Sequence, residues 1–211
     1  MDIIDFHTHD TGATSALISV DPRQFDPQPG KWYSLGYHPW HEVDKLTDDD
    51  FALLQRCASH DQVLAIGETG MDSLRGASRD VQAQVFTRHL TLAAILDKPV
   101  VVHCVRTAQD ILTSRHKAGL DTVAMAIHGF RGNVHVARTL LAAGCYLSFG
   151  HQFNPAALEA TPLDRLLIET DDSATSINDV ASIIASTLHL SVAQVKTIAT
   201  HNATTFLSRS H

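Results

Sequence analysis

The chain has 211 residues, 44% of them hydrophobic, and its 23 acidic side chains outnumber 16 basic ones, for a formal net charge of −7. This length suits one domain with a sizeable core, residues 1–211, and no stretch reaches the roughly 18 apolar residues of a membrane span. The acidic balance argues against stable nucleic-acid binding through clustered Lys and Arg, but it leaves room for a nuclease that holds a few phosphates at a metal centre.

The N-terminal residues and the cysteines bear on the compartment. The chain begins Met1-Asp2 and shows no basic region followed by an apolar one, so no secretory signal is visible. Its cysteines are odd in number and widely spaced, at Cys57, Cys104 and Cys145. That pattern favours free thiols in a reducing compartment. We therefore expect a cytoplasmic, monomeric protein without membrane association.

Short apolar runs bounded by turn residues predict eight strands. They lie at about residues 3–9, 15–20, 31–36, 62–67, 100–103, 122–127, 145–149 and 165–168. Segments with helical periodicity and N-terminal capping residues predict six helices, at about residues 48–60, 78–96, 107–117, 133–143, 177–188 and 191–208. In the second of these helices we expect Val81, Val85, Leu92 and Ile95 to face the core.

The alternation of strands and helices indicates parallel βα units. The fold class is therefore α/β, and we expect a (β/α)8 TIM-barrel-like domain of small size. A short loop with Pro27 and Pro29 joins the second and third strands, so one helix is expected to be missing there. A doubly wound open sheet is the alternative.

Metal-binding side chains gather where the predicted strands end. His7 and His9 alternate along the first strand, so they project to the same side. The other four follow later strands: Glu68, His103, His128 and Asp171. In a barrel these strand ends meet at one mouth, and six such ligands suit a pair of divalent ions. The alternatives are an exposed loop acid for Glu68, core histidines at His103 and His128, and a helix cap at Asp171.

Several strings in this chain resemble one known family. They are Asp5-Phe6-His7-Thr8-His9, Gly36-Tyr37-His38-Pro39, Gly67-Glu68-Thr69-Gly70-Met71-Asp72, His103-Cys104-Val105-Arg106, His128-Gly129-Phe130-Arg131-Gly132 and Glu169-Thr170-Asp171. Their order is that of the TatD family of metal-dependent deoxyribonucleases, and the resemblance extends to Asn202–Phe206. It implies an amidohydrolase-type metal hydrolase with a TIM-barrel fold.

The resemblance implies roles for these residues. One ion would be held by His7, His9, Glu68 and Asp171. Glu68 would bridge to a second ion held with His103 and His128, and Asp171 would take the proton of the attacking water. Mg is the ion that the resemblance allows, whereas four imidazoles also permit Zn, Mn, Fe or Ni.

Two further residues are candidate substrate contacts. Arg106 carries a planar guanidinium that suits a phosphate, although a structural ion pair would also explain it. His38 lies in a turn after the third predicted strand and would either contact the substrate or stabilise the turn.

The sequence favours a two-metal phosphodiesterase that cleaves DNA from ends or in single strands. One alternative is a hydrolase that acts on a small amide, lactone or phosphoester at the same metal centre, because this fold hosts many reactions. Another is a binding or scaffold protein with a vestigial site.

Overall fold

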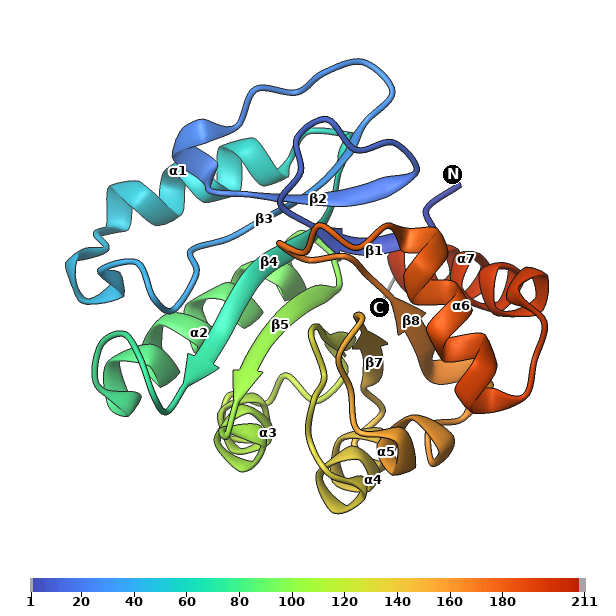
Figure 1. Ribbon diagram of the computed structural model, residues 1–211. Coiled ribbons are helices and arrows are strands. Elements are labelled where there is room, and N and C mark those ends of the chain that lie inside the picture. The colour runs from blue at the N-terminus through green and yellow to red at the C-terminus, as the bar shows by residue number, and fades with distance from the viewer. Residues whose placement is uncertain (1, 209–211) are drawn as a thin grey trace. The chain divides into compact units, whose positions relative to one another are not determined.

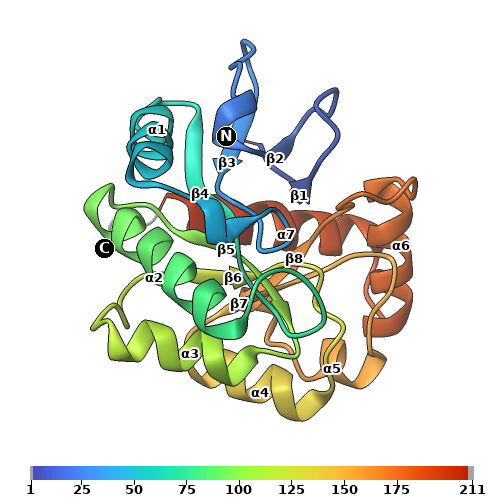
Figure 2. The same ribbon diagram turned by 90° about the vertical axis from the view of Figure 1, so that its left-hand side faces the viewer.

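The computed structural model describes residues 2–208 (Figure 1 and Figure 2). They form two compact groups of segments, residues 2–18 with 126–208, and residues 19–125. In the first group, α6 and α7 pack against β8. In the second group, α2 packs against both β4 and α3.

The strands form a single eight-stranded sheet in which the strand order follows the chain, from β1 to β8. Their bounds are β1 Asp5–Thr8, β2 Ala16–Val20, β3 Trp32–Leu35, β4 Val63–Asp72, β5 Val100–Val105, β6 Met125–Ile127, β7 Tyr146–Phe149 and β8 Leu166–Ile168. The pairs β1–β2, β3–β4, β4–β5, β6–β7 and β7–β8 are all parallel. The predicted (β/α)8 class is confirmed.

Seven α-helices follow the strands within the described residues. They are α1 Asp48–Ala58, α2 Arg79–Ile95, α3 Ala108–Lys117, α4 Val134–Ala142, α5 Pro155–Glu159, α6 Ile177–Leu188 and α7 Val192–Leu207. Between β2 and β3 lies only the 3-10 turn Pro22–Gln24, so the predicted gap in the helix pattern is confirmed. The prediction missed α5, because five residues are too few to show a helical period. None of the described helices has the length and apolarity that crossing a membrane requires.

Capping side chains determine where several helices begin. Thr47 caps α1: its Oγ1 accepts from the Asp50 amide, and Asp50 Oδ2 accepts from the Thr47 amide at 2.8 Å. The Thr47 amide and the Arg23 guanidinium lower the pKa of Asp50 to about 2. The acidic first turn of α1 thus stabilises the helix, in the way the macrodipole favours. Ser78 caps α2 in the same manner.

Strand β4 is longer than the sequence predicts. It continues past Glu68 to Asp72, and its second half pairs with β5 through Gly70 opposite His103 and Asp72 opposite Val105. The register shifts between Ile66 and Thr69. Glu68 and His103 therefore lie inside their strands, and the prediction that each ends its strand is wrong. The Gly-rich sequence hid this strand, because Gly normally weakens one.

The buried face of α2 is mostly apolar and includes Leu92, as predicted, but Val81 and Val85 are only half-buried and two polar residues share the face. Ile95 is 66% exposed, so its expected place in the core is wrong, whereas Gln82 and His89 are buried. Gln82 Oε1 accepts from the Asp72 amide at 2.7 Å, and its Nε2 donates to the Arg75 and Ala77 carbonyls. These bonds tie the loop that follows β4 to the helix.

The buried imidazole of His89 is held in its neutral form. Its Nε2 accepts from the Tyr37 amide at 3.0 Å, and its Nδ1 lies 2.8 Å from the Val85 carbonyl, which requires a donor. Burial lowers the pKa of His89 from 6.5 to about 4. A proton on Nε2 would remove the acceptor of the Tyr37 amide, so protonation opposes folding.

We therefore expect the folded protein to become less stable as the pH is lowered, because of this one residue. Above pH 6.5 His89 is mostly neutral in both the folded and the unfolded chain. Between pH 6.5 and about 4 the imidazole is protonated in the unfolded chain but stays neutral in the folded one. The free energy of unfolding should drop by about 2 kcal/mol between pH 7 and pH 5 on this account. Urea unfolding of wild type and His89→Gln at both pH values measures it. Equal pH slopes in the two proteins would contradict the assignment.

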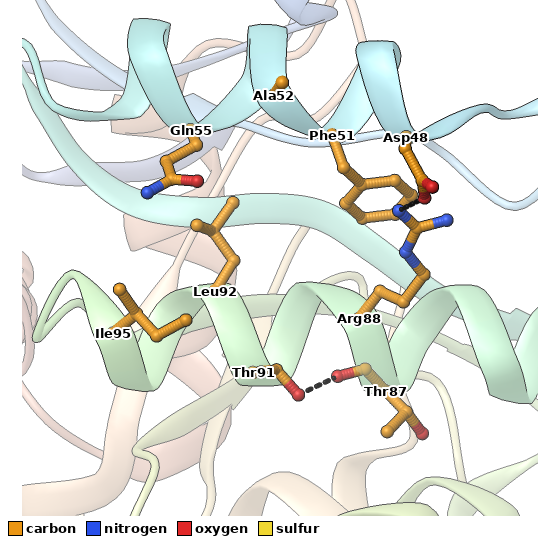
Figure 3. Close-up of a pocket in the computed structure, with 9 residues that line it drawn as sticks. All are labelled: Asp48, Phe51, Ala52, Gln55, Thr87, Arg88, Thr91, Leu92 and Ile95. Carbon is orange, nitrogen blue, oxygen red and sulfur yellow. Dashed lines mark hydrogen bonds and ion pairs between the residues drawn. The ribbon is translucent and has the colours of Figure 1, made fainter.

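An apolar groove of about 340 Å³ lies between α1 and α2 (Figure 3). At one end Arg88 bonds Asp48 at 2.7 Å and lies over the Phe51 ring at 3.8 Å. The remaining lining is mostly apolar or uncharged, with Leu92 and Ile95 on the α2 side. None of the described imidazoles lines the groove, and the contacts of Arg88 with Asp48 and Phe51 connect α2 to α1 at its end.

Candidate metal centre

The first cluster of potential ligands comes from β1 and from the segments after β6 and β8. We call it the Asp171 group; its members are His7, His9, His128 and Asp171. Asp171 Oδ1 lies 3.7 Å from His7 Nε2 and 3.6 Å from His9 Nε2. The His7 and His128 rings are 4.2 Å apart. One ligand atom each from His7, His128 and Asp171 fall within 4.8 Å of one another.

Asp171 is positioned by backbone pairing with β1. Its amide donates to the His7 carbonyl at 2.9 Å, and its carbonyl accepts from the His9 amide at 3.3 Å. Asp171 adopts φ 55°, an unfavourable value for a non-glycine residue. Such strain persists where surrounding contacts enforce it, often at functional sites.

A buried carboxylate ties the neighbouring residue to β1. Asp5 accepts from the Thr170 amide at 2.9 Å and from the Thr170 hydroxyl at 2.6 Å. Burial raises the pKa of Asp5 to about 6, although both bonds from Thr170 oppose the shift. Asp5 therefore fixes the segment that carries Asp171.

A second buried carboxylate, Glu169, supports His128. Its Oε1 lies 3.4 Å from His128 Nδ1 and accepts from the Gly129 amide at 2.6 Å. Burial raises the pKa of Glu169, but the hydrogen bond and charge of His128 and the charge of His7 outweigh it, so the net shift is downward. Glu169 thereby orients the imidazole through Nδ1, which is a common arrangement behind metal-binding histidines.

The second cluster lies at β3, β4 and β5. We call it the Glu68 group; its members are His38, Glu68 and His103. Glu68 Oε1 lies 2.8 Å from His38 Nε2 and 2.8 Å from His103 Nδ1, and these two nitrogens are 3.3 Å apart. All three side chains are mostly buried. One carboxylate oxygen thus contacts two imidazole nitrogens, and these three atoms could bind one cation together.

Further contacts orient the imidazoles of the Glu68 group. His38 Nδ1 accepts from the Trp40 amide at 3.1 Å, which leaves Nε2 toward Glu68. His103 Nε2 lies 3.3 Å from Asp72 Oδ2, which also accepts from the Trp40 indole at 2.7 Å. Burial raises the pKa of Asp72, but the bonds from the Leu74 amide, Trp40 and His103 prevail and lower it.

The structure groups two residues differently from the expected sets. His128 lies with His7 and Asp171, whereas His38, expected as a substrate contact, lies with Glu68 and His103. Arg106 follows β5, is exposed and has φ 56°. Among the described residues it forms no ion pair with Glu169 or another acid. Its guanidinium is exposed and accessible to a ligand.

Sequence reasoning missed two residues that support the ligands, Asp72 and Glu169. Both occur within the strings that resemble the family: Asp72 follows Glu68 in one string, and Glu169 precedes Asp171 in another. The signal that could have found them is the pairing of every metal-binding histidine with a carboxylate or carbonyl behind it. Which carboxylate serves which histidine depends on register between strands, which local sequence does not show.

Both groups suit divalent cations. Imidazole nitrogens with carboxylate oxygens are ligands for Zn and Mn, among others. Bonds of about 2.1 Å place the ligands of one ion up to about 4.2 Å apart. Each group comes close to that span, since its three ligand atoms lie within 4.8 Å. The residues present therefore fit the metal that the sequence predicts.

Replacing Asp72 with Asn should weaken metal binding at the Glu68 group by about 10- to 100-fold, the usual effect of removing such a support. The amide can still accept from Trp40, but it no longer stabilises charge on His103. Titration of metal-free protein with Mn²⁺ or Zn²⁺ against a competing chelator measures the affinity. Asp110→Asn, which removes a surface partner of Arg79, is the matched control. Unchanged affinity in Asp72→Asn would contradict this role.

Comparisons with known proteins identify the family of the chain. Residues 25–208 match the family model described as TatD related DNase. The chain is 30% identical over 191 residues to the uncharacterized metal-dependent hydrolase YabD of Bacillus subtilis, covering 81% of this chain and 74% of that protein. It is 38% identical over 153 residues to the 3'-5' ssDNA/RNA exonuclease TatD of Cronobacter turicensis, covering 67% of this chain and 57% of that one.

Solved structures share the fold. The TatD homolog YjjV of Escherichia coli superposes with a TM-score of 0.80 at 20% identity, over 97% of each chain. The phosphotriesterase homology protein of Escherichia coli, complexed with phosphate in its active site, gives 0.64 at 15% identity over 84% of this chain and 74% of that one. At these identities the likeness concerns the fold alone.

Proposed function

Because this chain belongs to the family of TatD-related DNases, and is thereby a metal-dependent hydrolase, we propose that it cleaves phosphodiester bonds of DNA with two divalent ions. The observation that carries the proposal is the number of candidate ligands: a set around Asp171 and a set around Glu68 each bring imidazoles and a carboxylate within 4.8 Å. One ion needs only one such group. The exonuclease name of a relative supports a nucleic-acid substrate, although this chain spans 57% of that relative.

The proposed centre follows the ligand sets that the family resemblance implies. His7, His9, Asp171 and Glu68 would hold one ion, and Glu68 would bridge to a second ion held with His103 and His128. The membership of the chain in this family supports the assignment. The position of His38 beside Glu68 makes it a further candidate ligand of the second ion.

Bound divalent ions activate water and stabilise negative charge on a phosphodiester. The protein's residues then perform the remaining steps. Asp171 accepts the proton of the attacking water, since a carboxylate at the site can act as general base. Arg106 binds a phosphate oxygen pair through its planar guanidinium. Asp72 and Glu169 keep the imidazoles of His103 and His128 oriented while the substrate binds.

Ends and single strands are the proposed substrates. The mouth of a barrel, where active sites of this fold lie, accepts a terminus more readily than an unbroken duplex. Mg, Mn and Zn are the ions proposed. A monomeric state and a cytoplasmic location remain predictions.

Digestion of end-labelled single-stranded DNA tests the proposal, with Mg²⁺, with Mn²⁺ and with chelator. We expect metal-dependent shortening that disappears in His128→Ala and persists in His135→Ala, whose exposed imidazole lies on α4. No cleavage with any ion, by protein that carries stoichiometric metal, would overturn the nuclease assignment. The centre would then act on a small amide, lactone or phosphoester.

A further inference from the structure

An exposed tryptophan stands directly beside the Glu68 group. Trp40 is 42% exposed, and its ring centroid lies 4.8 Å from that of His38 and 5.3 Å from that of His103. Large aromatic side chains are normally buried, and those left exposed at a site commonly contact a ligand. The metal chemistry described above uses this indole only through its hydrogen bond to Asp72 and assigns no role to its ring face.

The Trp40 ring is held in place despite its exposure. Its Nε1 donates to Asp72 Oδ2 at 2.7 Å, and Asp72 also contacts His103. The Trp40 amide donates to His38 Nδ1. The indole is thus connected to His103 through Asp72, and the backbone of Trp40 is bonded to His38, so the ring would bind a ligand without first becoming ordered.

Arg75 stacks on the indole. Its guanidinium carbon lies 4.5 Å from the Trp40 ring centroid, over the ring face. Arg75 is exposed, and its backbone is fixed because its carbonyl accepts from buried Gln82 at 2.9 Å. The adjacent Leu74, 61% exposed, has its amide bound to the other oxygen of Asp72. We call Trp40 and Arg75 the stacking platform.

We propose that the stacking platform binds the nucleobase of the nucleotide whose phosphate occupies the Glu68 group. This deepens the proposed function and rests on it. Indole and guanidinium planes are the two surfaces on which proteins stack single-stranded bases, and such stacking tolerates any base. A base and its phosphate are separated by one sugar, which suits a platform that touches the imidazoles. The platform thus selects nucleotides over other phosphoesters and does not discriminate among bases.

Binding of products to metal-loaded protein tests the platform without any cleavage. The probes are deoxyadenosine monophosphate and deoxyribose 5-phosphate, which differ only in the base. Trp32→Phe leaves Trp40 as the only tryptophan of the two in the chain, so its fluorescence reports stacking. We expect the nucleotide to quench it and to bind about 5- to 100-fold more tightly than the sugar phosphate.

Substitutions then assign the effect. Trp40→Ala should lower nucleotide affinity to that of deoxyribose 5-phosphate, whereas Trp40→Phe should restore most of it, and both variants should keep their metal content. Arg75→Ala should give an intermediate loss. Equal binding of the two probes by wild type, or no quenching by the nucleotide, would overturn the platform. So would an equal loss for both probes in Trp40→Ala.

A different experiment tests the nuclease assignment. A single-stranded oligonucleotide with a normal end and one with an abasic end are digested by the same preparation. Faster cleavage of the normal end supports the platform. Equal cleavage of both removes the platform and keeps the nuclease, whereas cleavage of neither by metal-loaded wild type removes the nuclease. If neither oligonucleotide is cleaved, the fluorescence measurement still shows whether the base stacks on Trp40.

Discussion

Replacing Asp171 with Asn is expected to lower the rate of DNA cleavage by about 10²- to 10⁴-fold, the range that a positioned general base contributes. The amide keeps the shape of the side chain but cannot take a proton from water. The backbone bonds of residue 171 with His7 and His9 do not involve the side chain, so the fold should persist. Single-turnover cleavage of labelled DNA in saturating Mn²⁺ measures the effect.

The neighbouring carboxylate offers the control. Asp172 is exposed next to Asp171, and Asp172→Asn should keep wild-type activity. Metal content of both variants separates loss of the base from loss of a ligand. An Asp171→Asn enzyme within about threefold of wild type, with metal bound, would exclude Asp171 as the base.

Gly70→Ala is expected to destabilise the fold by about 3 kcal/mol or more, which is large for one methyl group. A Cβ at this position would lie 2.0 Å from the His103 carbonyl oxygen, and Gly70 has φ 145°, which side chains rarely adopt. Backbone atoms cannot move aside cheaply, so β4 and β5 would separate where Glu68 and His103 are held. Urea unfolding followed by circular dichroism gives the free energy.

Gly119→Ala is the matched control for Gly70→Ala. Gly119 also has positive φ, 69°, but nothing lies within 4 Å of an added Cβ. It should cost only about 1 kcal/mol, the penalty of the conformation itself. If the two variants lose the same stability, the close approach of β4 to β5 at Gly70 is not what requires glycine there.

Local signals in the sequence located most elements. The strands are short apolar runs, and the helices begin at caps such as Thr47 and Ser78, whose bonds involve residues three positions away. The prediction failed at β4, where Gly67 and Gly70 concealed a strand that continues to Asp72. It failed again at Ile95, because the apolar pattern of α2 does not show which face other strands will cover.

The sequence by itself determined the fold class and predicted the candidate ligand residues. His7 and His9 share a side through strand alternation, and Glu68, His103, His128 and Asp171 belong to strings recognisable in one dimension. Only the tertiary structure decided that His128 lies with Asp171 and His38 with Glu68, and that Asp72, Glu169, Gln82 and His89 support them. The reason is physical: strand periods and caps are set by neighbours along the chain, whereas these contacts depend on register and packing between segments far apart in sequence.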